Sequence, residues 1–183
     1  MDLNEEQIIE GCKAKDCRCQ ALLYKQNASM LYGMALRYCA FEDDAKDVLH
    51  DAFLKIFESI EQYNGKGTFR AWMMRIVVNE ATDLYRRRKQ TELFDDFEEE
   101  IIDNSVVVSD MLKHEILLKF IQELPDGYRV VFNLCEVEGY SQSEAAEILN
   151  WNPSTCRSQL FKAKNALRKR VEEFNKIEKI IVR

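Results

Sequence analysis

The stretch SQSEAAEILNWNPSTCRSQLFKAKNALRKR, residues 141–170, predicts two helices joined by a tight turn. Ser141 stands three residues before Glu144, the capping-box spacing in which the two side chains satisfy free amides at a helix start. Asn150 tolerates the left-handed backbone of a tight turn, and Asn152 with the proline after it suits the first turn of the next helix. Two helices about four residues apart form the helix-turn-helix unit that lays its second helix in the DNA major groove.

The second of these helices has an apolar side and a basic side. Its apolar stripe is Leu160, Ala163, Leu167, Val171 and Phe174. Residues 151–170 carry six Lys or Arg and no Asp or Glu, although the net charge of the chain is -6. Positive side chains neutralise phosphates, and a few side chains near the helix start reach base edges. The duplex-DNA contacts expected on this helix are Thr155, Arg157, Ser158, Phe161, Lys162 and Lys164.

Within that set, Arg157 is the best base reader, because a guanidinium bonds guanine through two hydrogen bonds. Phe161 suits packing between helices equally well, and the sequence leaves both roles open. Cys156 and Trp151 are assigned to the core, where a small thiol and a large ring fill space.

Two more helices are predicted upstream. One runs from Met111 to Leu124 and ends at Pro125-Asp126-Gly127. A short one follows, with Val130, Val131 and Leu134 on one side. Residues 111–175 therefore form a helical domain, and residues 176–183 are a tail that could extend the last helix or bind a partner.

Composition indicates a mostly helical, soluble chain. Only six of the 183 residues are Gly and two are Pro, so the turns that many short strands need are missing. The sequence has no secretion signal and no apolar window long enough for a membrane span, which predicts a cytoplasmic protein without membrane insertion. The six Cys are expected to be reduced thiols, and the spacing of Cys12, Cys17 and Cys19 does not favour a metal site. No metal and no cofactor are expected.

Basic and acidic residues are separated into blocks along the chain. Residues 62–90 hold seven basic residues against Glu80 and Asp83, whereas residues 91–110 hold eight acidic residues and no basic one. Mutual repulsion favours an extended acidic segment. The fold class predicted is all-α, with two small helical domains, residues 1–90 and 111–175, joined by a flexible acidic linker, residues 91–110.

The first domain has its own pattern. One helix combines a wide apolar face with an acidic one, and residues 63–69 form a loop with two glycines. On the helix from Arg70 to Arg88, Asn79 follows Arg75 and precedes Asp83 by four-residue steps, and we expect this row to lie opposite the stripe of Trp72, Ile76 and Leu84. Trp72 is assigned to the core, with stacking on a base as the alternative. A basic track, apolar surfaces and a pocket are what holding an unpaired strand requires.

Two runs of sequence resemble a known family. FEDDAKDVLHDAFLKIFESIEQY, followed by NGKGTFRAWMMRIVVNEATDLYRRRK, resembles domain 2 of the extracytoplasmic-function sigma factors of bacterial RNA polymerase. ELPDGYRVVFNLCEVEGYSQSEAAEILNWNPSTCRSQLFKAKNALRK is similar to their domain 4. Together the runs cover most of positions 20 to 170, and the acidic segment falls where that family has its interdomain linker.

The resemblance implies a sigma factor that directs core polymerase to promoters and helps to open the -10 region. It implies contacts with the clamp coiled coil of the largest polymerase subunit by Asp43, Asp44, Asp47, Val48, Asp51 and Leu54. His50 departs from the family, which usually has Gln there. It also implies contacts with the unpaired -10 strand by Asn64, Lys66, Thr68, Phe69, Arg75, Asn79, Arg86 and Arg87, with Arg88 facing the same backbone. Many relatives are held by an anti-sigma partner, and the sequence leaves open whether this chain has one.

Two other interpretations compete with this one. A stand-alone helix-turn-helix regulator would use the second domain and leave the pattern of residues 64–88 without a role. A protein-interaction module that sequesters another factor would explain the acidic segment but neither basic helix. An enzyme is not expected, since no phosphate-binding glycine loop and no interpretable pairing of nucleophile and base are found.

Overall fold

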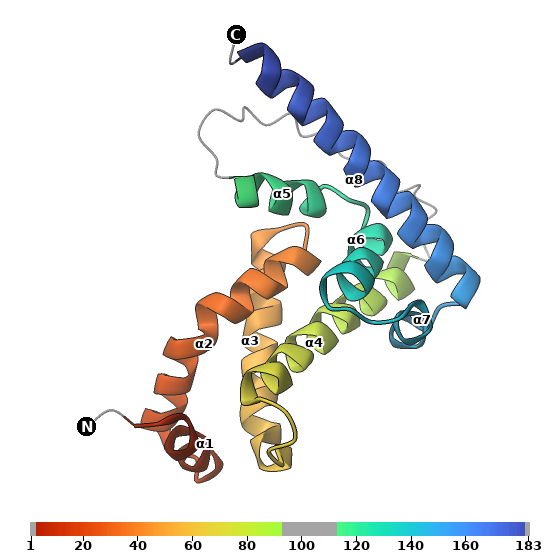
Figure 1. Cartoon of the computed structure of the whole chain (residues 1–183). Helices are drawn as coiled ribbons and strands as arrows, with labels where there is room; N and C mark the ends of the chain where they lie inside the picture. Colours follow the sequence, from red (N-terminus) through yellow and green to blue (C-terminus); the bar gives the residue numbers. More distant parts are fainter. Residues whose placement is uncertain (1–2, 93–112, 182–183) are drawn as a thin grey trace. The chain divides into compact units, whose positions relative to one another are not determined.

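The computed structural model describes residues 3–92 and 113–181, which form helices joined by short loops, with no β-strand among them. The predicted all-α class is therefore confirmed. The helices, drawn in Figure 1, are α1 (Glu5–Lys13), α2 (Cys17–Tyr38), α3 (Glu42–Ser59), α4 (Phe69–Glu92), α5 (Lys113–Gln122), α6 (Asp126–Phe132), α7 (Gln142–Leu149) and α8 (Pro153–Ile181). A 3-10 turn, η1 (Ile60–Gln62), follows α3, and a π-helical turn, η2 (Asn133–Val137), follows α6.

The chain divides into two compact units, residues 1–36 with 41–84 and residues 37–40 with 85–183. Most of the expected acidic linker, from residue 93 on, lies outside the described residues. The last helix continues through most of the tail to Ile181, so the tail extends α8. None of the described helices combines the length and the apolar character that a membrane crossing requires.

The helices α1 to α4 share one core. Its most deeply buried side chains include Leu31, Met34, Ile56, Ile60, Met73 and Val77, each at most 2% exposed. In α3 the residues at three- and four-residue spacings from Ala45 to Ile56 are buried, as the predicted apolar face requires. Glu42, Asp43 and Asp44 occupy the first turn of α3, where negative charge is stabilised by the helix dipole. The apolar face of α3 and the middle of α4 thus fix these two helices in one unit.

The two N-terminal helices were not predicted. A capping box marks the start of α1: the Asn4 side chain accepts from the Gln7 amide at 2.8 Å, and the Gln7 side chain accepts from the Asn4 amide at 3.0 Å. The sequence signal for this start, Asn followed three residues later by Gln, is present at positions 4 and 7. Helix α1 packs against η1.

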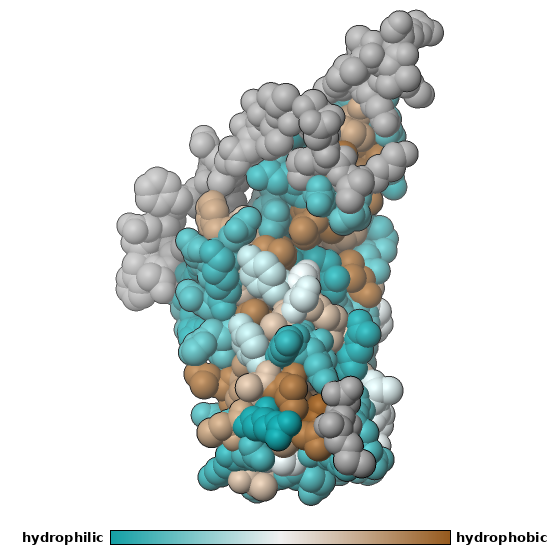
Figure 2. Space-filling model, turned by 90° about the vertical axis from the view of Figure 1, so that its left-hand side faces the viewer, coloured by the Kyte–Doolittle hydropathy of each residue, from teal (hydrophilic) through white to brown (hydrophobic). Residues whose placement is uncertain are grey.

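Brown hydrophobic patches interrupted by teal hydrophilic residues are visible on the side shown in Figure 2.

In the second unit α8 packs against α5, α6 and α7. Leu160 and Ala163 of its stripe are 4% and 0% exposed, whereas Leu167, Val171 and Phe174 are half-buried. Cys156 is fully buried, as expected, and Trp151 is only half-buried. The buried N-terminal part of the apolar stripe therefore fixes which side of α8 faces the core.

The turn between α7 and α8 has the predicted chemistry. The capping box at Ser141 is formed in both directions, and the predicted helix of residues 142–149 is α7. Asn150 has a φ of 54°, the left-handed conformation that its sequence position indicated. The Asn152 side chain accepts a hydrogen bond from the Ser154 amide at 3.0 Å, in the first turn of α8. The predicted helix-turn-helix is confirmed as part of the fold.

The core assigned to α3 can be tested by two substitutions of similar size on one helix. Ile56 is 0% exposed and Leu54 is 50% exposed. We expect Ile56→Ala to lower the free energy of unfolding by about 2–5 kcal/mol, because it leaves a cavity. Leu54→Ala should change it by less than about 0.5 kcal/mol. Urea denaturation followed by circular dichroism measures both, and equal losses would contradict the assigned core.

Candidate nucleic-acid interface

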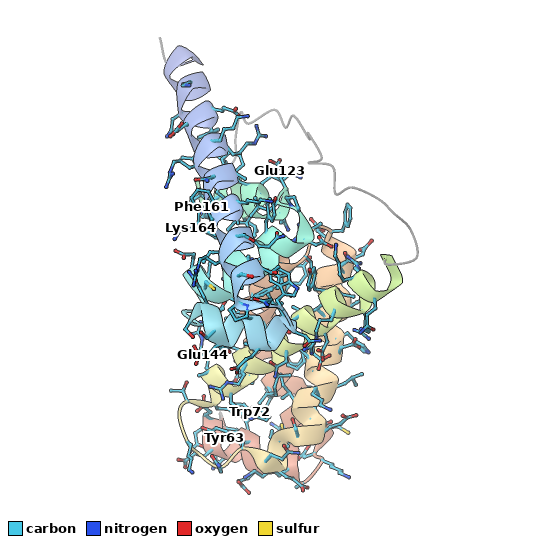
Figure 3. All side chains as sticks on the ribbon, turned by 90° about the vertical axis from the view of Figure 1, so that its right-hand side faces the viewer. Tyr63, Trp72, Glu123, Glu144, Phe161 and Lys164 are labelled. Atoms are coloured by element: carbon cyan, nitrogen blue, oxygen red, sulfur yellow. The ribbon has the colours of Figure 1, made fainter. Side chains whose placement is uncertain are left out.

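The outward side of α8 carries the residues predicted to contact duplex DNA. Thr155, Arg157, Ser158, Phe161, Lys162 and Lys164 are all exposed. The Phe161 ring is 66% exposed, so it does not pack in the core, and its contact with DNA stays a prediction. Figure 3 labels Phe161 and Lys164 on α8. Helix α8 thus presents an apolar ring among cationic and hydroxyl side chains on one solvent-facing surface.

The cationic residues of this surface differ in their surroundings. The Lys164 ammonium lies 2.9 Å from a carboxylate oxygen of Glu136, in η2. Arg157 and Lys162 make no ion pair within residues 3–92 and 113–181. The hydroxyl of Ser158 donates to the Thr155 carbonyl at 2.9 Å. The positive field of the surface therefore comes mainly from Arg157 and Lys162, since the charge of Lys164 is partly neutralised.

Further along, α8 is anchored to α5. The Arg170 guanidinium lies 3.1 Å from a carboxylate oxygen of Glu123 and 5.2 Å from the centre of the Phe120 ring. The ring of Phe174 meets the same Phe120 ring edge-on, with centroids 5.9 Å apart. Edge-to-face aromatic contacts and cation–π contacts both stabilise such a junction. These contacts hold the C-terminal half of α8, where the apolar stripe is only half-buried.

The loop before α4 is shaped by short-range hydrogen bonds. Gly65 and Gly67 have φ of 76° and 80°, which glycine adopts without steric cost. The Asn64 side chain accepts from the Lys66 amide at 3.1 Å, and the Thr68 hydroxyl accepts from the Ala71 amide at 3.1 Å. Asn64, Lys66 and Thr68 are exposed. Three of the four loop residues predicted to contact an unpaired strand are therefore accessible.

Phe69 departs from the prediction that it touches DNA. Its ring is 2% exposed and stacks on Trp72, with centroids 5.4 Å apart. The ring of Tyr63 meets Phe69 at 5.0 Å and Trp72 at 5.7 Å. Sequence reasoning missed this because residue type does not tell on which side of the loop a ring lies. In this structure Phe69 supports the loop from inside.

A groove of about 660 Å³ lies between the end of α3 with η1 and the middle of α4. Arg75 and Asn79, both predicted to contact the unpaired strand, are among its lining residues. The remaining lining residues are Lys55, Glu58, Ser59, Gln62, Trp72, Ile76, Glu80 and Asp83. Acidic and basic side chains both line it, so the groove offers hydrogen-bond donors and acceptors in one place.

The groove corrects one expectation. Trp72 and Ile76 were expected to lie opposite Asn79, but they line the same groove as Asn79. Residues 72, 76, 79 and 83 follow each other by three or four positions, which places them on one face of a helix. Trp72 is half-buried, so one part of its ring belongs to the aromatic cluster with Tyr63 and Phe69 and another part to the groove. The two roles considered for Trp72 are thus not exclusive.

Arg86 and Arg87 lie beyond the groove, on the last turns of α4. Arg87 is exposed and Arg86 is half-buried, and Arg88 is half-buried as well. The groove ends, by its lining residues, at Asp83. The structure therefore places these arginines on the same helix as Arg75 and Asn79, but not in the same groove.

The acidic side of α3 carries the residues predicted to contact a protein partner. Asp43 and Asp47 are exposed, Asp44 and Asp51 are half-buried, and Leu54 is 50% exposed. A hydrogen bond from the Lys46 ammonium, 2.8 Å away, lowers the pKa of the Asp43 carboxyl. Val48 departs from the prediction, because it is 3% exposed and belongs to the core. It can support a contact surface but not form one.

The three N-terminal cysteines do not gather at one site. Cys12 and Cys19 are buried and Cys17 is exposed. Burial raises the pKa of the Cys12 thiol to about 11, which disfavours the thiolate that binds metals. Across the part of the chain that the structure describes, no group of three or more His, Cys, Asp or Glu side chains is placed to hold a metal ion.

Comparison with known proteins gives matches over both units. The family model for sigma-70 region 2 matches residues 23–91, and the model for sigma-70 region 4 matches residues 114–167. The ECF RNA polymerase sigma-E factor of Haemophilus influenzae is 28% identical over 183 aligned residues, covering 93% of this chain and 96% of the relative. The RNA polymerase sigma-H factor of Pseudomonas aeruginosa is 26% identical, covering 92% and 94%.

A solved structure has the same type of fold. It is the sigma factor RpoE of Bartonella quintana, in a co-crystal with the anti-sigma factor NepR, with a TM-score of 0.52 and 21% identity, covering 83% of this chain and 96% of the other. The region 2 match contains α3, the loop, the groove and the arginines of α4, and the region 4 match contains the basic face of α8. Each cluster of candidate residues therefore lies inside one of the matched regions.

The ion pair of Lys164 generates a prediction about duplex DNA. Glu136→Gln should release the Lys164 ammonium for a phosphate, and the plot of log affinity against log salt should become steeper by about one. Fluorescence anisotropy with a labelled duplex at several salt concentrations measures this slope. Glu172→Gln, which removes an exposed carboxylate further along α8, is the matched control. An equal change in both variants would mean that only net charge matters.

Proposed function

Because the chain belongs to the extracytoplasmic-function family of sigma factors, we propose that its two helical units divide promoter recognition between duplex and unpaired DNA. As a sigma factor, the protein directs core RNA polymerase to promoters, and the polymerase makes the phosphodiester bonds. The observation that carries the proposed division is that α8 presents an exposed basic face while a separate groove on α4 holds Arg75 and Asn79. One surface suits a groove of duplex DNA, and the other suits a single base.

The duplex contact is proposed for the N-terminal half of α8. Arg157 reads a base edge, with Thr155, Ser158 and Phe161 close to it on the exposed side. An aromatic ring at this place suits the methyl group of a thymine. Lys162 neutralises a phosphate, and Lys164 contributes less because Glu136 holds its ammonium. This arrangement is proposed to recognise the -35 element.

The unpaired -10 strand is proposed to pass along the loop and the groove. Asn64, Lys66 and Thr68 are exposed on the loop, and the groove volume of about 660 Å³ falls within the usual range for ligand pockets. The Asn79 amide both donates and accepts, so it can bond the edge of an everted base. Capturing a base in this state favours the melted promoter, because the unit has a higher affinity for the single strand than for the duplex.

The polymerase contact is proposed for the acidic side of α3. Asp43, Asp44, Asp47 and Asp51 give it negative charge, and Leu54 adds an exposed apolar side chain. Complementary charge speeds association and fixes register. The side chain of His50 is exposed on α3 where the family usually has Gln, so we expect the polymerase contact at that position to differ in detail from the family's.

Three further assignments belong to this proposal. The domains are residues 1–90 and 111–175, with residues 91–110 as the linker between them and residues 176–183 as the tail. The protein acts in the cytoplasm, where its polymerase works. An anti-sigma factor is a fitting partner, since the Bartonella quintana relative was solved with one.

Crossed substitutions test the division of labour. Arg157→Ala should weaken binding to duplex -35 DNA roughly 5- to 150-fold, the loss expected for one bidentate base contact. Asn79→Ala should leave that binding unchanged and weaken binding to a labelled single strand of the -10 region by about 10-fold. Both are measured with holoenzyme assembled from core polymerase and the purified chain. Equal effects of each variant on both DNA forms would contradict the division.

The general function has a direct test. In vitro transcription on a library of genomic fragments should give discrete start sites only when the chain is added to core polymerase. Mapping those starts also yields the -35 and -10 sequences used in the other experiments. If the chain alone protected the same DNA from cleavage and core polymerase added nothing, the protein would be a stand-alone regulator.

A further inference from the structure

We propose that Tyr63 is a positioning residue whose hydroxyl holds the loop Asn64–Thr68 in the shape that receives an unpaired base; this rests on the function proposed above. Tyr63 is not one of the residues that the sequence singled out. Its role follows from one hydrogen bond and two ring contacts.

Ordering the loop Asn64–Thr68 costs conformational entropy. It contains Gly65 and Gly67, both with positive φ, and its residues from 64 to 68 are exposed. Glycine loses more conformational freedom than any other residue when it is ordered. A loop of this kind binds a base weakly unless something in the free protein already holds it in its bound shape.

The Tyr63 hydroxyl provides that restraint. It donates a hydrogen bond to the Gly67 carbonyl, with 2.9 Å between the oxygens. The bonds at Asn64 and Thr68 span only two and three residues and act at the two ends of the loop. The Tyr63 bond instead joins the residue before the loop to its second glycine, so it closes the turn that both glycines form.

The Tyr63 ring is itself held in place. It packs on Phe69 with centroids 5.0 Å apart and an interplanar angle of 61°, and on Trp72 with centroids 5.7 Å apart. Phe69 is buried, so the cluster of three rings is anchored in the core of the unit. Figure 3 shows the labelled side chains of Tyr63 and Trp72 near one another. The hydroxyl is therefore aimed at the loop by a rigid support.

The same cluster connects the loop to the groove. Trp72 touches both other rings of the cluster and also lines the groove that contains Arg75 and Asn79. A hydrogen bond from Tyr63 to the loop thus sets the position of the loop relative to the residues that meet the base. Tyr63 acts through the loop and need not touch DNA.

Tyr63→Phe isolates the hydroxyl, because a phenylalanine ring keeps the contacts with Phe69 and Trp72. Loss of one hydrogen bond of ordinary strength corresponds to about a 2- to 10-fold change in an equilibrium constant. We expect holoenzyme with Tyr63→Phe to bind a fluorescein-labelled single strand of a mapped -10 region that much more weakly. Binding to duplex -35 DNA should not change, and the midpoint of thermal unfolding should fall by no more than the few degrees that the loss of one hydrogen bond causes. Tyr24→Phe, at a half-exposed tyrosine of α2, is the matched control.

A second readout needs no DNA. Hydrogen exchange of the Lys66 amide, which donates to the Asn64 side chain, should become faster in Tyr63→Phe, while the amides of α3 and α4 exchange at their usual rates. A residue that only supported the core would not loosen the loop alone. Faster local exchange together with weaker strand binding supports the proposal.

The outcomes separate the two proposals. Unchanged strand binding or unchanged loop exchange in Tyr63→Phe overturns the role of Tyr63 and leaves the proposed function standing. Equal weakening of single-strand and duplex binding also overturns it, because the effect would then be general. If the wild-type holoenzyme fails to bind the single strand, the proposed function fails, and the role of Tyr63 falls with it.

Discussion

The burial of one side of α8 is the constraint on which the surface proposed to contact duplex DNA depends. Cys156, Leu160 and Ala163 are almost completely buried, and a helix with three buried residues at three- and four-residue spacings can rotate very little about its axis. Arg157, Phe161 and Lys162 then have to face outward. A small thiol at position 156 and a methyl group at position 163 let α8 approach α6 and α7 closely. The direction of the basic face is thus a consequence of apolar packing and not of charge.

Helix α4 is also fixed by burial of one side, but its candidate residues line a groove. One side is buried through Met73 and Val77, while the groove runs along residues 72 to 83. The helix is therefore both a core element and the wall of the groove proposed to bind a base, and the rigidity of the core is passed directly to Arg75 and Asn79. The loop before α4 has no such core of its own, and ring contacts and hydrogen bonds hold it instead.

In both basic regions of this acidic chain, carboxylates lie close to the cationic side chains. Glu136 pairs with Lys164 on the surface of the second unit, and Glu58, Glu80 and Asp83 line the same groove as Arg75. Carboxylates near a phosphate chain lower affinity, but they also accept hydrogen bonds from base amino groups. Such surfaces favour selective binding over tight binding, which suits a sigma factor that acts together with core RNA polymerase.

Local patterns along the chain are enough to define much of this protein. The capping box at Ser141, the left-handed Asn150 and the apolar stripe of α8 are set by interactions between residues a few positions apart, so the helix-turn-helix could be predicted. The capping box at Asn4 carries the same kind of signal for α1. Only the tertiary structure decided that Phe69 and Val48 are buried, that Lys164 is paired with Glu136, and that Trp72 and Asn79 share a groove. These facts depend on which side of a helix or loop meets a partner distant in sequence, and no local spacing contains that information.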